Sequence, residues 1–201
     1  MSTYGNLKYN FTFPASNPSG SLVLIKSITA SSSASVSFVN GSSDVVLDST
    51  YKAYKFVFKN IHISNDSTRL QFNGSTDGGS NYNVTKTGTF FISAQTEGGS
   101  TIFQYQGTYD LAQSTGVQVL CQDQGNGNDE SGSGEMWLYN PSSTTYVKHY
   151  TVLYHHYHAA NYAWSNYIAG YCNTTSAVDA IQFNMSSGNI DDGTISLYGL
   201  A

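Results

Sequence analysis

Residues 51–63 carry the sequence YKAYKFVFKNIHI, and this stretch decides the fold class. Within it, over residues 54–59, bulky aromatic side chains alternate with lysine or valine. Successive side chains of a β-strand point to opposite faces of the sheet, so the alternation predicts a strand with one buried face. A helix would instead need apolar residues three or four positions apart. The stretch is therefore expected to form a long β-strand.

The same two-residue period recurs along the chain, and Gly, Asn, Asp and Ser separate the alternating stretches. Further strands are expected at residues 22–29, 34–39, 68–73, 83–93, 101–106, 117–121, 134–139, 145–158, 163–172, 178–184 and 193–198. No stretch keeps a helical stripe. Many short strands without helical crossovers predict an all-β fold, an antiparallel β-sandwich or jelly roll.

Three glycine-containing segments are expected to be turns, because glycine adopts positive φ without a steric clash. The loops at residues 75–82 (STDGGSNY) and 95–100 (QTEGGS) are expected to close hairpins. Asp191 and Asp192, which precede Gly193, are expected in a turn between the final strands.

The N-terminal residues differ from the rest of the chain. Pro14 and Pro18 lie among Asn, Ser and Gly, where a central strand would lose hydrogen bonds. Residues 1–20 are therefore expected to be an arm or attachment segment. Residues 21–201 are expected to form a single β-sandwich domain, a common length for one all-β domain.

Composition excludes several classes of partner. Only 10% of the 201 residues are charged, the net charge is -5, and the eight Lys and Arg are scattered, which argues against binding a nucleic-acid backbone. The longest apolar run, about four residues at 22–25, is far short of the roughly 20 needed to cross a bilayer. The first residues lack the pattern of a secretory signal, and Cys121 and Cys172 are expected to be free thiols.

The stretch 149–158 is unusually rich in histidine and tyrosine. Alternation places His156 and His158 on one face of a strand with Tyr150 and Tyr154. The other face receives His149, His155 and Tyr157. One of the two faces is expected to be a subunit interface or an open binding surface.

His156 and His158 are also weak candidates for metal binding, because two imidazoles at that spacing project together. No nearby Cys or carboxylate completes a zinc site within one chain, although three-fold symmetry would supply six nitrogens. The favoured interpretation is a structural strand whose rings stack and hydrogen bond. No cofactor is expected.

The loop DQGNGNDE at residues 123–130 collects oxygen ligands and glycines, which suits calcium. Its spacing does not fit an EF-hand, and Asn, Asp and Gly are common in turns for other reasons. A solvated turn is the favoured interpretation.

Aromatic residues near 162–167 suggest a surface on which a sugar ring can stack. The candidate binding residues are Trp164, Tyr162 and Tyr167, because Trp164 lies among polar neighbours in NYAWSNY and is expected to be partly exposed. Trp137, within MWLY, is expected to belong to the core.

No catalytic motif is present. The sequence contains no GxSxG elbow, HExxH helix or phosphate-binding loop. Glycoside hydrolysis needs two positioned carboxyl groups, and among thirteen scattered acidic residues some pair can always be chosen. The number of acidic residues is therefore weak support for this activity. The chain is therefore expected to have no enzymatic activity and no catalytic residues.

Three stretches resemble a group of marine bacteriophage virion proteins, of the cyanophage type and often tail-fibre-like. They are LQFNGSTDGGSNYNVTKTGTFF at 70–91, LYNPSSTTYVKHY at 138–150 and NTTSAVDAIQFNMSSGNIDDGTISLYGL at 173–200. The resemblance covers roughly residues 50–200. It implies a structural protein of a phage particle, located at the tail or on the capsid surface. It carries no catalytic motif.

These observations favour a non-enzymatic tail-fibre or tail-associated module of a virion, made in the host cytoplasm, that contacts the host surface. The alternative is a capsid decoration or knob protein on the phage head. A polysaccharide-degrading tail enzyme is the least favoured class. The expected partners are other virion structural proteins, further copies of the chain in a homo-oligomer, with a trimer favoured, and a host surface polysaccharide or receptor.

Overall fold

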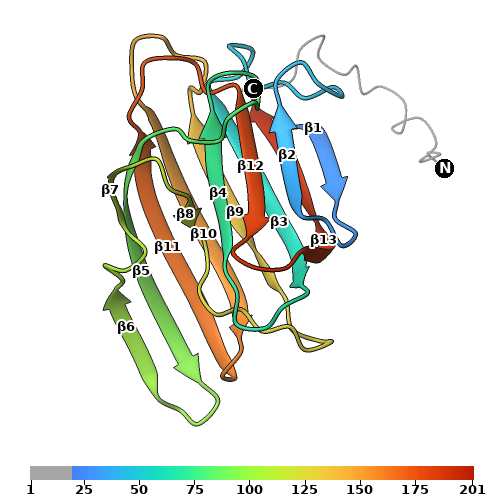
Figure 1. The fold of residues 1–201 in the computed structure, drawn as a ribbon, viewed down its shortest axis with the longest axis vertical. Coiled ribbons are helices and arrows are strands. Elements are labelled where there is room, and N and C mark those ends of the chain that lie inside the picture. The colour runs from blue at the N-terminus through green and yellow to red at the C-terminus, as the bar shows by residue number, and fades with distance from the viewer. Residues whose placement is uncertain (1–19) are drawn as a thin grey trace, which may run out of the picture.

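Thirteen strands, all paired antiparallel, build residues 20–201, the part of the chain that this computed structural model describes (Figure 1). In chain order they are β1 (Leu22–Thr29), β2 (Ser35–Val39), β3 (Ala53–Ile63), β4 (Leu70–Ser75), β5 (Lys86–Thr96), β6 (Thr101–Tyr105), β7 (Leu111–Ser114), β8 (Gln118–Val119), β9 (Gly132–Tyr139), β10 (Lys148–His158), β11 (Tyr162–Cys172), β12 (Ala180–Met185) and β13 (Ile190–Leu200). Within these residues no helix is long and apolar enough to cross a membrane.

The strands form two unequal sheets that pack face to face (Figure 1). The large sheet has the order β1-β13-β3-β9-β10-β11-β5-β6, with β7 also paired to β5. The small sheet has the order β2-β12-β4-β8. The predicted all-β class and the antiparallel sandwich are confirmed. Since the small sheet packs against one face of the large sheet, the opposite face of the large sheet is left open.

All twelve predicted strands are present, with ends that differ by a few residues. Sequence reasoning missed β7, whose four residues LAQS are too few to show a period. In β3, Tyr54, Phe56 and Phe58 are fully or nearly fully buried, while Lys55 and Val57 are only half-buried. The alternation that decided the fold class therefore describes the two faces of a sandwich strand.

Two of the predicted turns are wrong and one is confirmed. The loop at 95–100 closes the hairpin between β5 and β6, where Gln95 is paired with Thr101. The loop at 75–82 instead connects β4 in the small sheet to β5 in the large sheet, so it is a crossover. Asp191 and Asp192 lie inside β13 at an irregularity in its pairing with β3, where Gly193 has a φ of 113°. The residues of a turn therefore do not determine which of the two sheets the following strand joins.

Aromatic rings from both sheets meet in the core. The ring of Phe183 on β12 lies 5.2 Å from Phe56 and 5.1 Å from Phe58, both on β3. Phe72 on β4 lies 5.1 Å from Tyr150 on β10. These edge-to-face contacts add to the burial of large apolar surfaces, which is the main force holding two sheets together. One connected cluster runs from Ala30 to Leu197.

The start of the described chain is joined to its end. The amide of Gly20 donates a hydrogen bond to the carbonyl of Ala201 at 2.5 Å, which fixes the beginning of β1 beside the end of β13. The predicted arm otherwise lies in residues 1–19, outside the described residues. Cys121 and Cys172 are free and fully buried, and burial raises the pKa of these thiols to about 12 and about 11.

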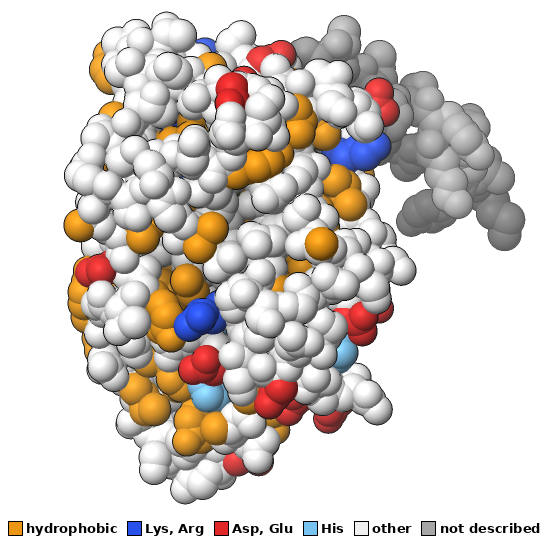
Figure 2. All heavy atoms as spheres, in the orientation of Figure 1, with side chains coloured by type: hydrophobic (Ala, Val, Ile, Leu, Met, Phe, Trp, Pro, Cys, Tyr) orange, Lys and Arg blue, Asp and Glu red, His pale blue; other side chains and the backbone are white. Residues whose placement is uncertain are grey.

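The side of the molecule that carries the small sheet is mostly uncharged, as Figure 2 shows for the surface facing the viewer. This agrees with a chain in which only 10% of residues are charged. The polar surface is built mainly from hydroxyl and amide groups.

Candidate functional site

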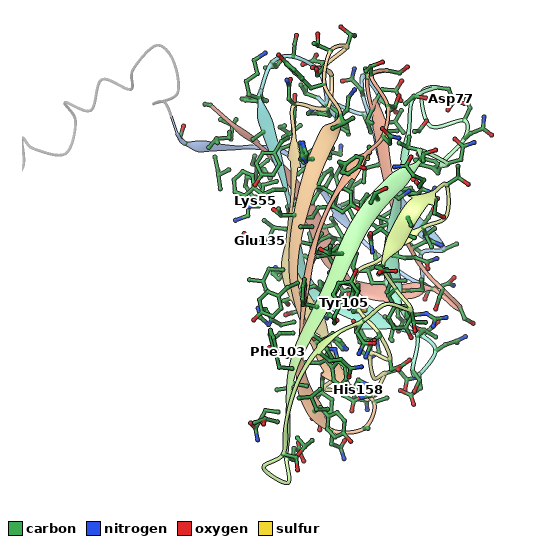
Figure 3. The ribbon with its side chains drawn as sticks, turned by 90° about the vertical axis from the view of Figure 1, so that its left-hand side faces the viewer. Lys55, Asp77, Phe103, Tyr105, Glu135 and His158 are labelled. Atoms are coloured by element: carbon green, nitrogen blue, oxygen red, sulfur yellow. The ribbon has the colours of Figure 1, made fainter. Side chains whose placement is uncertain are left out.

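The candidate site lies on the open face of the large sheet, defined here as the side of β9, β10, β11, β5 and β6 that points away from the small sheet. From Lys148 to His156 in β10, alternate residues are buried, and the residues between them are exposed or half-buried. Figure 3 shows Lys55, Glu135 and Phe103 on this open side. His158 lies on the opposite side, toward the small sheet (Figure 3).

An aromatic row crosses the open face. Strand register aligns Leu153 of β10 with Tyr167 of β11, Tyr167 with Phe91 of β5, and Phe91 with Tyr105 of β6. Three of these side chains are exposed, Tyr167 by 42%, Phe91 by 38% and Tyr105 by 44%. The rings of Phe91 and Tyr105 meet edge to face at 5.0 Å. We call these four residues the aromatic row.

A fifth apolar side chain extends the row. Phe103 lies two residues before Tyr105 on β6 and is 79% exposed. The surface of a lone soluble domain seldom concentrates so many exposed large apolar groups without a binding partner. The open face therefore has the character of a recognition surface.

Two hollows flank the aromatic row along the strand direction. The first hollow has a volume of about 470 Å³ and is lined mainly by Thr87, Thr89, Tyr105, Asp110, His149 and Tyr171. The second has a volume of about 510 Å³ and is lined mainly by Gln95, Glu97, Ser133, His155, Tyr157 and Ser165. His149 and His155 are six residues apart on β10, so the hollows are separated by about 20 Å at the usual rise of a strand.

Each hollow contains a tyrosine hydroxyl that donates to a carboxylate. Tyr105 donates to Asp110 Oδ2 at 2.6 Å, and Tyr157 donates to Glu97 Oε1 at 3.0 Å. These hydrogen bonds raise the pKa of both phenols, because the ionised carboxylate favours the protonated hydroxyl. Each carboxylate still has free lone pairs that can accept a hydrogen bond from a ligand hydroxyl.

A second aromatic pair lies on β9, next to these strands. The rings of Trp137 and Tyr139 are nearly parallel, with centroids 6.3 Å apart. Lys55 places its ammonium group 5.1 Å from the centre of the Trp137 ring and forms an ion pair with Glu135 at 2.5 Å. The hydrogen bond from Lys55 lowers the pKa of Glu135. Trp137 was predicted to be in the core, and that prediction is wrong, because its parity places it on the open face.

The predicted binding residues lie on two different faces. Tyr167 is on the open face, as described above. Trp164 and Tyr162 belong to the alternate residues of β11 that face the packed side, and Trp164 is only 6% exposed. Trp164 stacks on His158 with centroids 4.5 Å apart, and its ring is nearly parallel to that of Tyr162. The predicted exposure of Trp164 is therefore wrong, and its ring packs on the opposite side of β11 from Tyr167.

The polar neighbours that suggested an exposed Trp164 have a structural role. Asn166 is fully buried and donates to the carbonyl of Tyr154 at 3.0 Å, and its amide nitrogen lies 3.1 Å from Nδ1 of His156. A polar residue that forms a hydrogen bond with a backbone group inside the core cannot be distinguished from a surface residue by its sequence alone.

His156 is a core residue. It is 5% exposed, and its Nε2 lies 2.8 Å from the carbonyl oxygen of Gln122, which requires a proton on Nε2. Burial lowers the pKa of His156 to about 3, because the charged imidazolium would lose its hydration. The predicted grouping of His156 and His158 with Tyr150 and Tyr154 is confirmed, but this face packs inside the sandwich.

Metal binding by the histidine pair finds no support in this geometry. Both ring nitrogens of His156 already face protein groups. Among residues 20–201, no group of three His, Cys, Asp or Glu side chains is placed to hold a metal ion.

The loop at 123–130 is not simply a solvated turn. Gln124 is fully buried, donates to the carbonyl of Ile61 at 2.7 Å and accepts from the hydroxyl of Tyr154 at 3.1 Å. Further along, Glu130 accepts the amide of Gly127 at 2.7 Å. The loop therefore closes one end of the core.

The described carboxyl groups whose pKa clearly departs from its ordinary value all depart downward. They are Asp48, Asp77 and Glu135, and hydrogen bonds to neighbouring groups are the main cause. A general acid needs the opposite shift. These three groups are therefore ionised at neutral pH and do not act as proton donors.

The fold and the open face together define a class, a two-sheet antiparallel β-sandwich whose large sheet exposes aromatic side chains on its open face. No family model and no curated protein matches the chain. Any assignment more specific than this class therefore depends on the residues of this chain.

Proposed function

We propose that the chain is a non-enzymatic recognition module of a bacteriophage particle that binds host surface polysaccharide through its open face. The supporting observation is the aromatic row, which crosses four adjacent strands, exposes Tyr167, Phe91 and Tyr105, and is flanked by two hollows whose linings include hydroxyl groups. Sugar rings present apolar faces that pack on aromatic rings, and their hydroxyls need hydrogen-bonding partners. The phage assignment rests on the resemblance of residues 70–91, 138–150 and 173–200 to virion proteins.

Binding of the purified protein to intact candidate host cells tests this function. We expect saturable binding that isolated surface polysaccharide from the same cells competes away. Saturable binding that the polysaccharide leaves unchanged would contradict a glycan receptor. Absence of binding to marine bacterial hosts, cyanobacteria included, would contradict host recognition itself.

The alternative function is capsid decoration, and one observation favours it. Leu22 and Leu24, on the edge strand β1, are 44% and 55% exposed. An apolar edge strand is suited to contact with another protein. Imaging of the particle distinguishes the two positions: density for this chain at the tail supports the proposal, and a regular pattern over the capsid supports the alternative.

We also propose that the chain forms a homo-oligomer, with a trimer favoured, to which residues 1–20 contribute. Deletion of residues 1–19 is expected to lower the molar mass measured by light scattering, because a polar segment that contains Pro14 and Pro18 is poorly suited to form a core of its own and is better suited to contacts with other chains. A full-length chain that is as monomeric as the truncated one at high concentration would contradict this.

A further inference from the structure

We infer that the polysaccharide bound by the open face is uncharged, and that its chain runs along β10 and β11 from the first hollow to the second. This inference rests on the proposed function and adds the chemical class of the ligand. It follows from where the charged side chains of the molecule lie.

The open face carries no lysine or arginine on β10, β11, β5 or β6. The described cations of these strands, Lys86 and Lys148, are both fully buried on the packed side. Lys55 and Lys59 lie on β3, separated from β10 by β9, and Lys55 is already paired with Glu135. A carboxylated or sulfated chain would therefore meet no ammonium or guanidinium group along these four strands.

The charges that do line the hollows are negative. Asp110 lines the first hollow and Glu97 lines the second, each held by a tyrosine hydroxyl. A carboxylate forms a strong hydrogen bond with a neutral hydroxyl but repels an anion, and the net charge of -5 acts in the same direction. Each end of the surface thus accepts sugar hydroxyls and disfavours sugar carboxylates or sulfates.

The separation of the hollows gives the ligand its minimum extent. A ligand that fills both hollows and crosses the aromatic row must span about 20 Å along the strands, the separation of His149 and His155 on β10. A single sugar ring cannot do this, so the ligand is a segment of several sugar units. The exposed rings of Tyr167 and Phe91 lie between the two hollows and provide the stacking surface.

The test compares polysaccharides that share a backbone and differ in charge. The full-length protein is titrated at pH 8, where histidine is neutral, with dextran, laminarin and hydroxyethyl cellulose, and with dextran sulfate, sulfated laminarin and carboxymethyl cellulose. We expect at least one neutral chain to bind, and its anionic counterpart to bind at least about tenfold more weakly.

Charge-reversal variants test the role of the two acids. Asp110→Lys and Glu97→Lys are each expected to reduce the discrimination against the anionic chain severalfold. Asp44→Lys is the matched control, because Asp44 lies in the loop between β2 and β3, outside both hollows, and changes the net charge equally. Equal effects of all three substitutions would show that net charge alone causes the weaker binding of the anionic chain, and would overturn the role of the hollows.

The remaining outcomes are distinguishable. Tighter binding of an anionic chain than of its neutral counterpart would overturn the inference and leave the proposed function standing. Binding of none of the six chains would overturn the inference. If the Phe91→Ala/Tyr167→Ala variant then also has a lower molar mass in light scattering, the open face is assigned to a second copy of the chain, and the proposed function is overturned as well.

Discussion

Replacing Phe91 and Tyr167 together with alanine is expected to weaken polysaccharide binding by about 100-fold. Both side chains are exposed on adjacent strands and lie in register, so neither substitution removes a core contact. Loss of one stacked ring costs about 1.4 kcal/mol, a factor of ten in affinity, and two rings lose about twice that free energy. Isothermal titration with a neutral polysaccharide that binds the wild-type protein measures the change.

Tyr146→Ala provides the matched control for this double substitution. Tyr146 is 71% exposed but lies in the loop between β9 and β10, outside both hollows. It is expected to leave the affinity unchanged. An equal loss in the control, or wild-type affinity in the double variant, would show that the aromatic row is not the binding surface. Unchanged thermal unfolding of all variants confirms that the fold is intact.

Mild acid is expected to destabilise the fold through His156. The pKa of His156 is about 3 in the folded protein and about 6.5 in the unfolded chain, so the unfolded state binds the additional proton. The stabilising contribution is complete above pH 6.5 and is lost as the pH falls below that value. At pH 4.5 the free energy of unfolding is expected to be lower by about 3 kcal/mol.

Denaturant unfolding between pH 7.5 and pH 4.5 measures this loss. His156→Leu is expected to remove most of the pH dependence in this window, although the variant is less stable at pH 7.5 because Gln122 loses its partner. His149→Gln, an exposed residue on the same strand, is expected to retain it. An unfolding free energy of the wild-type protein that does not change between pH 6.5 and pH 4.5 would contradict the buried, neutral His156.

This stability effect replaces an expectation drawn from the sequence. The histidine-rich stretch 149–158 suggests from sequence that one strand face is a subunit interface or an open binding surface, and at an interface protonation of His156 and His158 would loosen an oligomer. The geometry instead makes His156 part of the sandwich interior, so the consequence of acid is loss of folding stability within one chain.

The sequence predicted the strands well because their signal is local. The alternation of Tyr54, Phe56 and Phe58 with Lys55 and Val57 describes a strand with one packed face, and no distant information is needed to recognise it. The hairpin at 95–100 was predictable for the same reason. Both depend only on residues that are neighbours in the chain.

The candidate site was not predictable in this way. The aromatic row joins residues from four strands, and only the register of the large sheet brings Leu153, Phe91 and Tyr105 into line with Tyr167. Alternation separates the two faces of a strand but does not say which face the small sheet covers. This is why Trp164 and Trp137 were each assigned to the wrong side.

Buried polar groups are also difficult to recognise from sequence. Lys86 is fully buried and donates to the carbonyl of Val84 at 2.8 Å, and burial lowers its pKa to about 8. In sequence a lysine at that position indicates a solvated face. Asn166 and Gln124 mislead in the same way, because their partners are backbone carbonyls that come close only in the folded chain.

Amide chemical-shift mapping of the isotopically labelled protein, titrated with a neutral polysaccharide that binds it, tests whether the open face of the large sheet is the binding surface. If it is, the largest changes fall at Leu153, Tyr167, Phe91 and Tyr105 and in the two hollows, and the small sheet is unaffected. Changes confined to β2, β12 and β4, or to the loops at the ends of the sandwich, would assign the binding to another surface.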